Sequence, residues 1–192
     1  MSNREKCEFE RLSDLNLKYF PNLSFEKVPI NTLDDPHIYK GFSATRKGLI
    51  IGISLKKMEG TSLTHFPVEI CQFKHLEKLS LFGHGIREIP DCISNLTELK
   101  YLNLSCNKIQ ELPESFSKLT KLRLLNLDNN PIEGIPECLR YLPLKHLFMN
   151  AMPRYRSSGV NVLNHIKLSD IEGEITEDKI RKKMASILPY IR

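Results

Sequence analysis

Two glycines flank a histidine in the stretch Phe82-Gly83-His84-Gly85, and residues of these types can take part in ligand binding or catalysis. A GxG pattern after an expected strand is part of the loops that bind nucleotide phosphates. Those loops carry a third glycine a few residues later, and none follows here. We therefore do not expect a nucleotide site.

A second candidate cluster contains metal-ligand types, namely His65, Cys71 and His75. Their spacing matches no standard zinc-ligand set, and no fourth ligand is evident. We expect no metal and no cofactor.

Cys106 could act as a thiol nucleophile if His84 or His146 were its base. Nothing in the sequence places either imidazole within hydrogen-bonding distance of the thiol. No pair of carboxylates is brought together by a recognisable pattern either. We therefore expect no catalytic residue and do not expect an enzyme.

Composition and charge exclude further classes of protein. The chain has 192 residues, 41% of them hydrophobic and 27% charged, which suits one soluble domain with flanking caps. The net charge of +5 divides into +1, +1 and +3 over residues 1–47, 48–150 and 151–192. No segment has the concentrated basic patch that nucleic-acid binding needs. The first residues, MSNREKCEFER, lack the apolar region of a secretory signal, and no apolar run is long enough to span a membrane.

Five cysteines are an odd number without the spacing of a disulfide framework. Cys71, Cys92 and Cys138 stand beside core positions of the repeat described next. Buried free thiols in a reducing compartment account for them better than disulfides do. We therefore expect a cytoplasmic location.

An internal repeat of 23 residues organises the middle of the chain. Segments that begin at Leu76, Leu99 and Leu122 align without gaps. The aligned anchors are Leu76/Leu99/Leu122, Leu79/Leu102/Leu125, Leu81/Leu104/Leu127, Ile86/Ile109/Ile132, Ile89/Leu112/Ile135 and Pro90/Pro113/Pro136. Weaker copies begin at Ile50 and at Leu144, so residues 48–152 contain about five copies, three of them regular.

The pattern LxxLxLxxNxIxxLPxxFxxL resembles the leucine-rich repeat. Because a proline follows the fifth anchor, the repeat is most similar to the cytosolic Ras-group-related (LPxxI-type) class. The resemblance covers a little over half of the chain. It implies an α/β fold, a curved solenoid with a parallel sheet on its concave side, short helical or irregular convex segments and helical terminal caps. It also implies binding of other proteins, with small GTPases among the candidate partners.

The physics of the repeat leads to the same architecture. In the LxLxL part alternate side chains face the core, so Leu102 and Leu104 point inward while Tyr101, Asn103 and Ser105 point outward. One such strand cannot bury its face or pair its backbone alone, whereas stacked copies do both.

An asparagine follows the strand in two copies, at Asn107 and Asn130, and a histidine, His84, takes this place in another. A buried amide here can bond the unpaired backbone groups of the turn and of the next coil. These three residues form the expected structural ladder. Met58 and Met152 occupy the position in the outer copies, and His84 must either bond through an imidazole nitrogen or remain exposed.

The two ends of a solenoid need caps. We expect residues 1–47 to form an N-terminal cap, with a helix around Phe9, Leu12 and Leu15; a stretch from Phe25 to Pro29 could be a decayed repeat. Residues 153–192 form the expected C-terminal cap, with a helix near residues 177–188 that could instead contact a partner or a membrane surface.

Outward positions of the sheet do not serve the core, so bulky apolar residues there need another reason. The candidate protein-binding residues are Lys78, Phe82, Tyr101, Asn103, Leu124, Asn126, Asp128, His146 and Phe148. Aromatic anchors within a polar rim are typical of protein interfaces. The alternatives are that isolated exposed apolar residues are ordinary, or that a terminal segment folds over them.

These observations favour a non-enzymatic, intracellular protein-interaction module that binds a signalling protein through the concave sheet. An alternative function is a scaffold or substrate-recognition subunit that docks through residues 1–47 or 154–192. We expect the chain alone to be a monomer.

Overall fold

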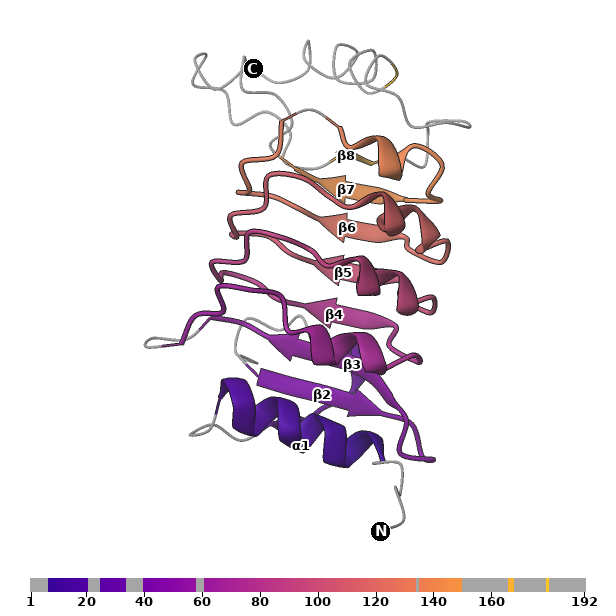
Figure 1. Ribbon diagram of the computed structural model, residues 1–192. Coiled ribbons are helices and arrows are strands. Elements are labelled where there is room, and N and C mark those ends of the chain that lie inside the picture. The colour runs from indigo at the N-terminus through magenta and orange to yellow at the C-terminus, as the bar shows by residue number, and fades with distance from the viewer. Residues whose placement is uncertain are drawn as a thin grey trace, which may run out of the picture.

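The computed structural model describes residues 7–20, 25–33, 40–57, 61–133, 135–149, 166–167 and 179. Short coils stack one above another, with strands on one side of the stack and short helices on the other (Figure 1). Each regular coil is one copy of the 23-residue repeat, so the period in the sequence becomes a period in space.

The strands form one sheet in which spatial order follows chain order. They are β1 (Glu26–Lys27), β2 (Lys40–Ala44), β3 (Ile50–Leu55), β4 (Lys78–Ser80), β5 (Tyr101–Asn103), β6 (Leu124–Asn126), β7 (His146–Phe148) and β8 (Ile166–Lys167). The five strands from β3 to β7 are parallel and in register. The face of this sheet turned away from the core is the concave face of the expected solenoid.

Four 3₁₀ helices return the chain on the other side of the core: η2 (Val68–Gln72), η3 (Asp91–Asn95), η4 (Glu114–Lys118) and η5 (Glu137–Leu139). Each begins directly after a proline, at Pro67, Pro90, Pro113 and Pro136. Proline fixes φ and needs no backbone hydrogen bond at the start of a helix, so it suits this position.

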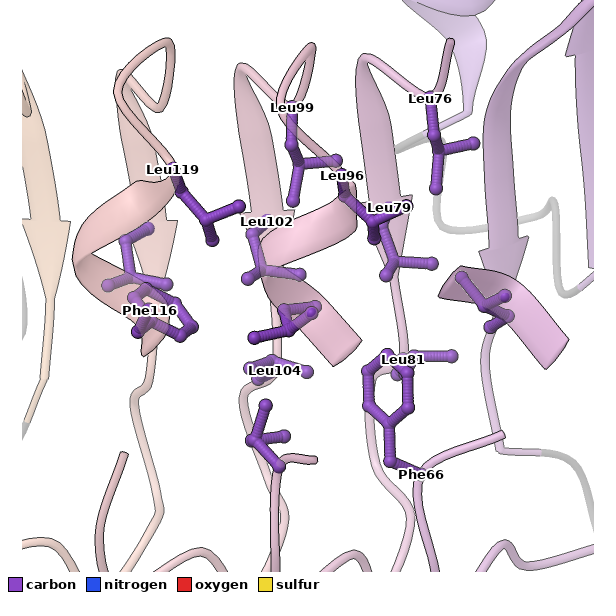
Figure 2. Close-up of a cluster of buried hydrophobic side chains, with 14 of the residues drawn as sticks. Phe66, Leu76, Leu79, Leu81, Leu96, Leu99, Leu102, Leu104, Phe116 and Leu119 are labelled. Carbon is purple, nitrogen blue, oxygen red and sulfur yellow. The ribbon is translucent and has the colours of Figure 1, made fainter. Parts of the chain in front are cut away.

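The core lies between the sheet and these helices. Leu102 and Leu104 from β5 and its exit are fully buried, as are Phe116 and Leu119 from the return segment. Figure 2 shows leucines from the strands and apolar residues from the return segments meeting in one continuous layer. Burying each such side chain contributes about 2 kcal/mol, so the repeat pattern is mainly a pattern of core formation.

A helix, α1 (Glu8–Tyr19), lies across the N-terminal end of the stack (Figure 1). Leu12 and Leu15 are buried against the core, and the Phe9 ring contacts Phe42 edge-on at 5.8 Å between centroids. The Glu10 carboxylate accepts a hydrogen bond of 2.8 Å from the backbone N–H of Cys7 at the helix start. The helix thus covers apolar surface that the first coil would otherwise expose.

The sheet departs from an all-parallel arrangement at both ends. β2 runs antiparallel to β3, and β8 runs antiparallel to β7. A short turn joins β2 to β3, in which Gly48 has φ +81° and its N–H donates to the Thr45 carbonyl at 3.0 Å. Only a hairpin fits so short a connection, because parallel strands need a long crossover. These two strands pair across the expected boundary between residues 47 and 48.

The stretch Phe25–Pro29 leads through Pro29 into a further 3₁₀ helix, η1 (Ile30–Thr32), as the prolines of the regular coils do. Its strand β1 pairs with β2, however, and not with the first regular coil. This segment is therefore not a regular repeat.

The expectation of free thiols at Cys71 and Cys92 is wrong. The structure joins them in a disulfide, with their Cα atoms 5.8 Å apart. The two residues are 21 positions apart, two fewer than the repeat, so Cys71 on η2 lies against Cys92 at the start of η3. Cys138 is buried with a free thiol, and burial raises its pKa to about 11.

The predicted C-terminal helix near residues 177–188 and the ladder positions Met58 and Met152 lie outside the described residues, apart from Lys179, which is helical. Among the described helices, none has both the length and the apolar character that crossing a membrane requires.

Candidate protein-binding face

The parallel register brings the predicted binding residues of β5, β6 and β7 together on the concave face. Tyr101, Leu124 and His146 are paired along one column. Asn103, Asn126 and Phe148 are paired along the next. All six side chains are half-buried, so they border one patch of aromatic, aliphatic and amide groups.

The two asparagines of this patch also make hydrogen bonds within their own coils. The Asn103 Oδ1 accepts hydrogen bonds from the Ser105 backbone N–H at 3.0 Å and from its hydroxyl at 2.6 Å. The Asn126 Oδ1 accepts one from the Asp128 N–H at 3.0 Å. These Asx-type contacts fix both side chains at the exit of their strands. The position of each amide is therefore fixed within its own coil.

Lys78 is held at the edge of the patch. Its ammonium lies 4.7 Å from the centre of the Tyr101 ring, a cation–π contact. It also donates a hydrogen bond of 3.3 Å to the Ile30 carbonyl. Lys78 thus connects Tyr101 to the segment that covers the neighbouring strands.

The N-terminal half of the concave face is covered by the chain itself. Leu33 is fully buried yet lies outside the main core, because it sits on Gly52. A Cβ at Gly52 would come within 2.2 Å of the Leu33 Cδ1 atom, so a side chain there would displace Leu33. Ser54 and Ser80, the next outward residues, are also buried. Among the described residues, the accessible part of the face therefore lies mainly on β5–β7 and at the exit of β4, where Phe82 is 39% exposed.

The ladder residues hold adjacent coils together beneath this face. The Asn107 Nδ2 donates to the Leu81 and Leu104 carbonyls, both at 2.8 Å, and its Oδ1 accepts from the Ile86 N–H at 3.2 Å. Asn130 repeats this pattern one coil later. Every such amide bonds both its own turn and the preceding coil, so the strand exits are fixed relative to one another.

His84 makes equivalent contacts through its imidazole. Its Nδ1 accepts a hydrogen bond of 3.2 Å from the Leu63 N–H, so the proton is on Nε2, which donates to the Leu55 carbonyl at 3.0 Å. Burial lowers the pKa of His84, against an opposing effect of the Leu55 carbonyl, and Lys57 lowers it further. The neutral form is therefore the one that fits the ladder.

A row of charged residues borders the patch where the strands begin, and sequence reasoning missed it. We call it the entry rim: Glu77, Glu98, Lys100, Lys121, Arg123 and Lys145. Lys100 pairs with Glu77 at 2.8 Å, and Lys121 pairs with Glu98 at 2.6 Å. The signal for this row was available, since Glu77, Lys100 and Arg123 follow one another at the repeat spacing.

Known proteins share this architecture. Residues 74–132 match the family model of the leucine rich repeat. The chain is similar to the ectodomain of the Arabidopsis thaliana receptor kinase GASSHO1/SCHENGEN3, at 27% identity over 56% of this chain and 13% of that one, with a TM-score of 0.50. It is similar in fold to pollen receptor kinase 3, at 22% identity over 72% and 70% of the two chains, with a TM-score of 0.52. The fold is a leucine-rich repeat solenoid.

A leucine-rich repeat protein of Leptospira interrogans is 32% identical over 50% of this chain, with a TM-score of 0.42. The chain spans 25% of that protein and 13% of the GASSHO1/SCHENGEN3 ectodomain. A comparison with the curated proteins gave no match. The match to the leucine rich repeat model and the fold shared with the GASSHO1/SCHENGEN3 ectodomain and pollen receptor kinase 3 confirm the fold class predicted from the sequence.

The residues first considered for chemistry have other roles in the solenoid. Both ring nitrogens of His84 bond to backbone groups, and Cys71 is in a disulfide. The Cys106 sulfur accepts a weak hydrogen bond from the Asn129 amide at 3.5 Å. Within the described ranges, no three histidine, cysteine or carboxylate side chains are placed to hold a metal ion.

Proposed function

We propose that this leucine-rich repeat protein is a non-enzymatic interaction module that binds a partner protein on the concave face of β5–β7. One observation carries the proposal: Tyr101, Leu124, His146 and Phe148 adjoin on two columns of a face that the core does not use. Protein interfaces place such anchors at the centre of a patch, with polar groups around them. Asn103, Asn126 and Asp128 would provide that polar border.

The nature of the fold supports this function. A leucine-rich repeat solenoid buries its leucines to build a rigid frame and leaves the residues between them for recognition. The similar GASSHO1/SCHENGEN3 ectodomain was solved in complex with Casparian strip integrity factor 2. That precedent supports a protein or peptide partner in general.

The finer part of the proposal is a signalling role in the cytosolic Ras-group-related class, with a small GTPase as a candidate partner. It rests on the prolines after the fifth anchors, which start η3 and η4 in the way that this class of repeat requires. The docking of a scaffold through its terminal segments is less favoured. In the described residues, α1 and the segment around Leu33 already pack on the solenoid.

The test compares affinity captures from cell lysate with the wild type and with Tyr101→Ala/Leu124→Ala as baits. Tyr141→Ala is the matched control, because Tyr141 follows η5 on the convex side and is 79% exposed. Equal stability of the three baits is first established by urea denaturation.

We expect the wild type and the Tyr141→Ala control to capture the same proteins, and the concave double variant to lose them. Recovery of the same proteins by all three baits would contradict binding through this face. Loss that follows deletion of residues 154–192, with an unchanged urea midpoint and the concave variant unaffected, would favour the scaffold function.

A further inference from the structure

The charges of the entry rim change along the solenoid. In its first part cations are neutralised within the rim, since Lys100 pairs with Glu77 and Lys121 with Glu98. In its last part Arg123 and Lys145 follow, and no described carboxylate lies within ion-pair distance of either. The rim of β6 and β7 therefore presents two cations without a counter-ion from the described chain.

Arg123 and Lys145 are neighbours on adjacent strands. The Lys145 N–H donates to the Arg123 carbonyl at 2.7 Å, which sets their backbones one strand spacing apart. Residues on adjacent strands can present their charged groups to one bound anion, such as a carboxylate.

The Arg123 guanidinium is already oriented. Its Nη1 donates to the Thr120 carbonyl at 3.2 Å and to the Leu122 carbonyl at 3.1 Å. The donors on Nε and Nη2 remain for a ligand, and their fork geometry matches a carboxylate. Arg123 is thus a pre-organised carboxylate receptor beside Leu124, the apolar anchor of the same strand.

The chain's own helix η1 and Leu33 show one way in which a segment covers this face. Leu33 sits on Gly52, and the Ile30 carbonyl accepts from the Lys78 ammonium at 3.3 Å. An apolar side chain therefore meets an outward position of the sheet, while an oxygen meets a cation of the same column. β6 offers an apolar contact at Leu124 and a cation at the residue before it, Arg123.

We propose that the partner presents an acidic segment to the concave face, with carboxylates at Arg123 and Lys145 and an apolar side chain against Leu124 and Tyr101. This inference rests on the proposed function and names the chemistry of its partner. A nucleic-acid phosphate is less suited to the site, because residues 48–150 carry a net charge of only +1 and Asp128 lies at the exit of β6.

The test uses a displayed library of short random peptides, selected on the immobilised full-length chain. Three proteins are compared: the wild type, Arg123→Glu/Lys145→Glu, and Arg87→Glu/Lys108→Glu. The last variant is matched in charge, since Arg87 and Lys108 are exposed and lie in the loops that follow the strands of their coils. Urea denaturation establishes that all three are folded, and Arg123→Gln/Lys145→Gln serves as a milder variant.

We expect the wild type and the matched control to select peptides rich in Asp and Glu around a Leu or Phe. Charge reversal on the rim should lower the affinity for these peptides at least about tenfold, and the glutamine variant should lower it by a smaller factor. Their binding should also weaken between about 0.1 and 1 M salt, where the screening length falls from ~10 to ~3 Å.

The outcomes separate this inference from the proposed function. Selected peptides that are neutral or basic, bind the charge-reversed protein equally well and are lost with Leu124→Ala would overturn the acidic partner alone. Peptides whose binding is unaffected by charge reversal and by Leu124→Ala would overturn both the acidic partner and binding through the concave face. Failure to select any peptide, with binding of a single-stranded oligonucleotide in its place, would also overturn the acidic partner.

Discussion

At the scale of single residues, the ladder shows how one position serves different side chains. Asn107 and His84 occupy equivalent places in successive coils, and each bonds backbone groups of the coil before it; Asn107 also bonds its own coil through the Leu104 carbonyl. The amide does so with two donors and one acceptor, the imidazole with one of each. The requirement is thus for a buried donor and acceptor, and asparagine is one of two solutions in this chain.

Replacing Asn107 with alanine should lower the free energy of unfolding by about 1–3 kcal/mol, because the change strands buried carbonyls of Leu81 and Leu104. Urea denaturation of both proteins measures the difference. Asn95→Ala is the control, since Asn95 is exposed at the end of η3 and should change stability little. An Asn107→Ala protein as stable as the control would refute this account of the ladder.

His84 should make stability depend on pH. Its pKa in the folded protein is below the ordinary value of 6.5, so the unfolded chain takes up a proton at a higher pH than the folded one. The stabilisation by neutral His84 is therefore fully present above about pH 6.5 and is lost as the pH falls through the folded pKa.

Urea midpoints measured from about pH 5 to about pH 8 test this against His84→Asn, which restores the usual ladder residue. The variant should match the wild type near neutral pH and be more stable below it. His65 and His75 are exposed in both proteins and cancel in the comparison. Parallel pH curves for the two proteins would exclude His84 as the source.

At the scale of elements, the regular coils were predictable from the sequence, whereas the exact position of one 3₁₀ helix relative to the next was not. Leucine spacing fixes which side chains of β4, β5 and β6 face the core, because any other register would expose leucine. The disulfide of Cys71 with Cys92 depends on where η2 lies relative to η3, and spacing within one repeat contains no such information. The neighbourhood of Tyr101 and Leu124 could be predicted from the register of the repeats. The covering of Gly52 could not, because Leu33, which covers it, lies outside the repeats.

The disulfide should contribute about 3 kcal/mol to stability, because it closes a loop whose ends are 21 residues apart. Cys71→Ala/Cys92→Ala should therefore unfold at a lower urea concentration than the wild type. A reducing agent should destabilise the wild type and the Cys7→Ser control, and leave the double variant unchanged. If a reducing agent left the urea midpoint of the wild type unchanged, the disulfide would not form in solution.

At the scale of the whole molecule, the two ends differ from the repeats and were the least predictable parts. The helix α1 was predicted from Leu12 and Leu15, but the hairpin of β2 and β3 gave no periodic signal. A cap makes contacts that occur once, so repetition cannot reveal them. The cytoplasmic location stays a prediction, and the disulfide counts against it because such bonds are typical of oxidising compartments.

The antiparallel strand β2 has a consequence for how copies of this chain meet. A parallel solenoid that ended in a bare coil would offer its edge to the last coil of another molecule, and repeated head-to-tail contacts of that kind build open-ended fibres. Among the described strands, the outermost at the N-terminal end is β1, which is two residues long and has both side chains, Glu26 and Lys27, exposed. A second chain that approached this end would meet a short, charged strand beside α1 that runs antiparallel to β3. This end therefore disfavours head-to-tail polymerisation.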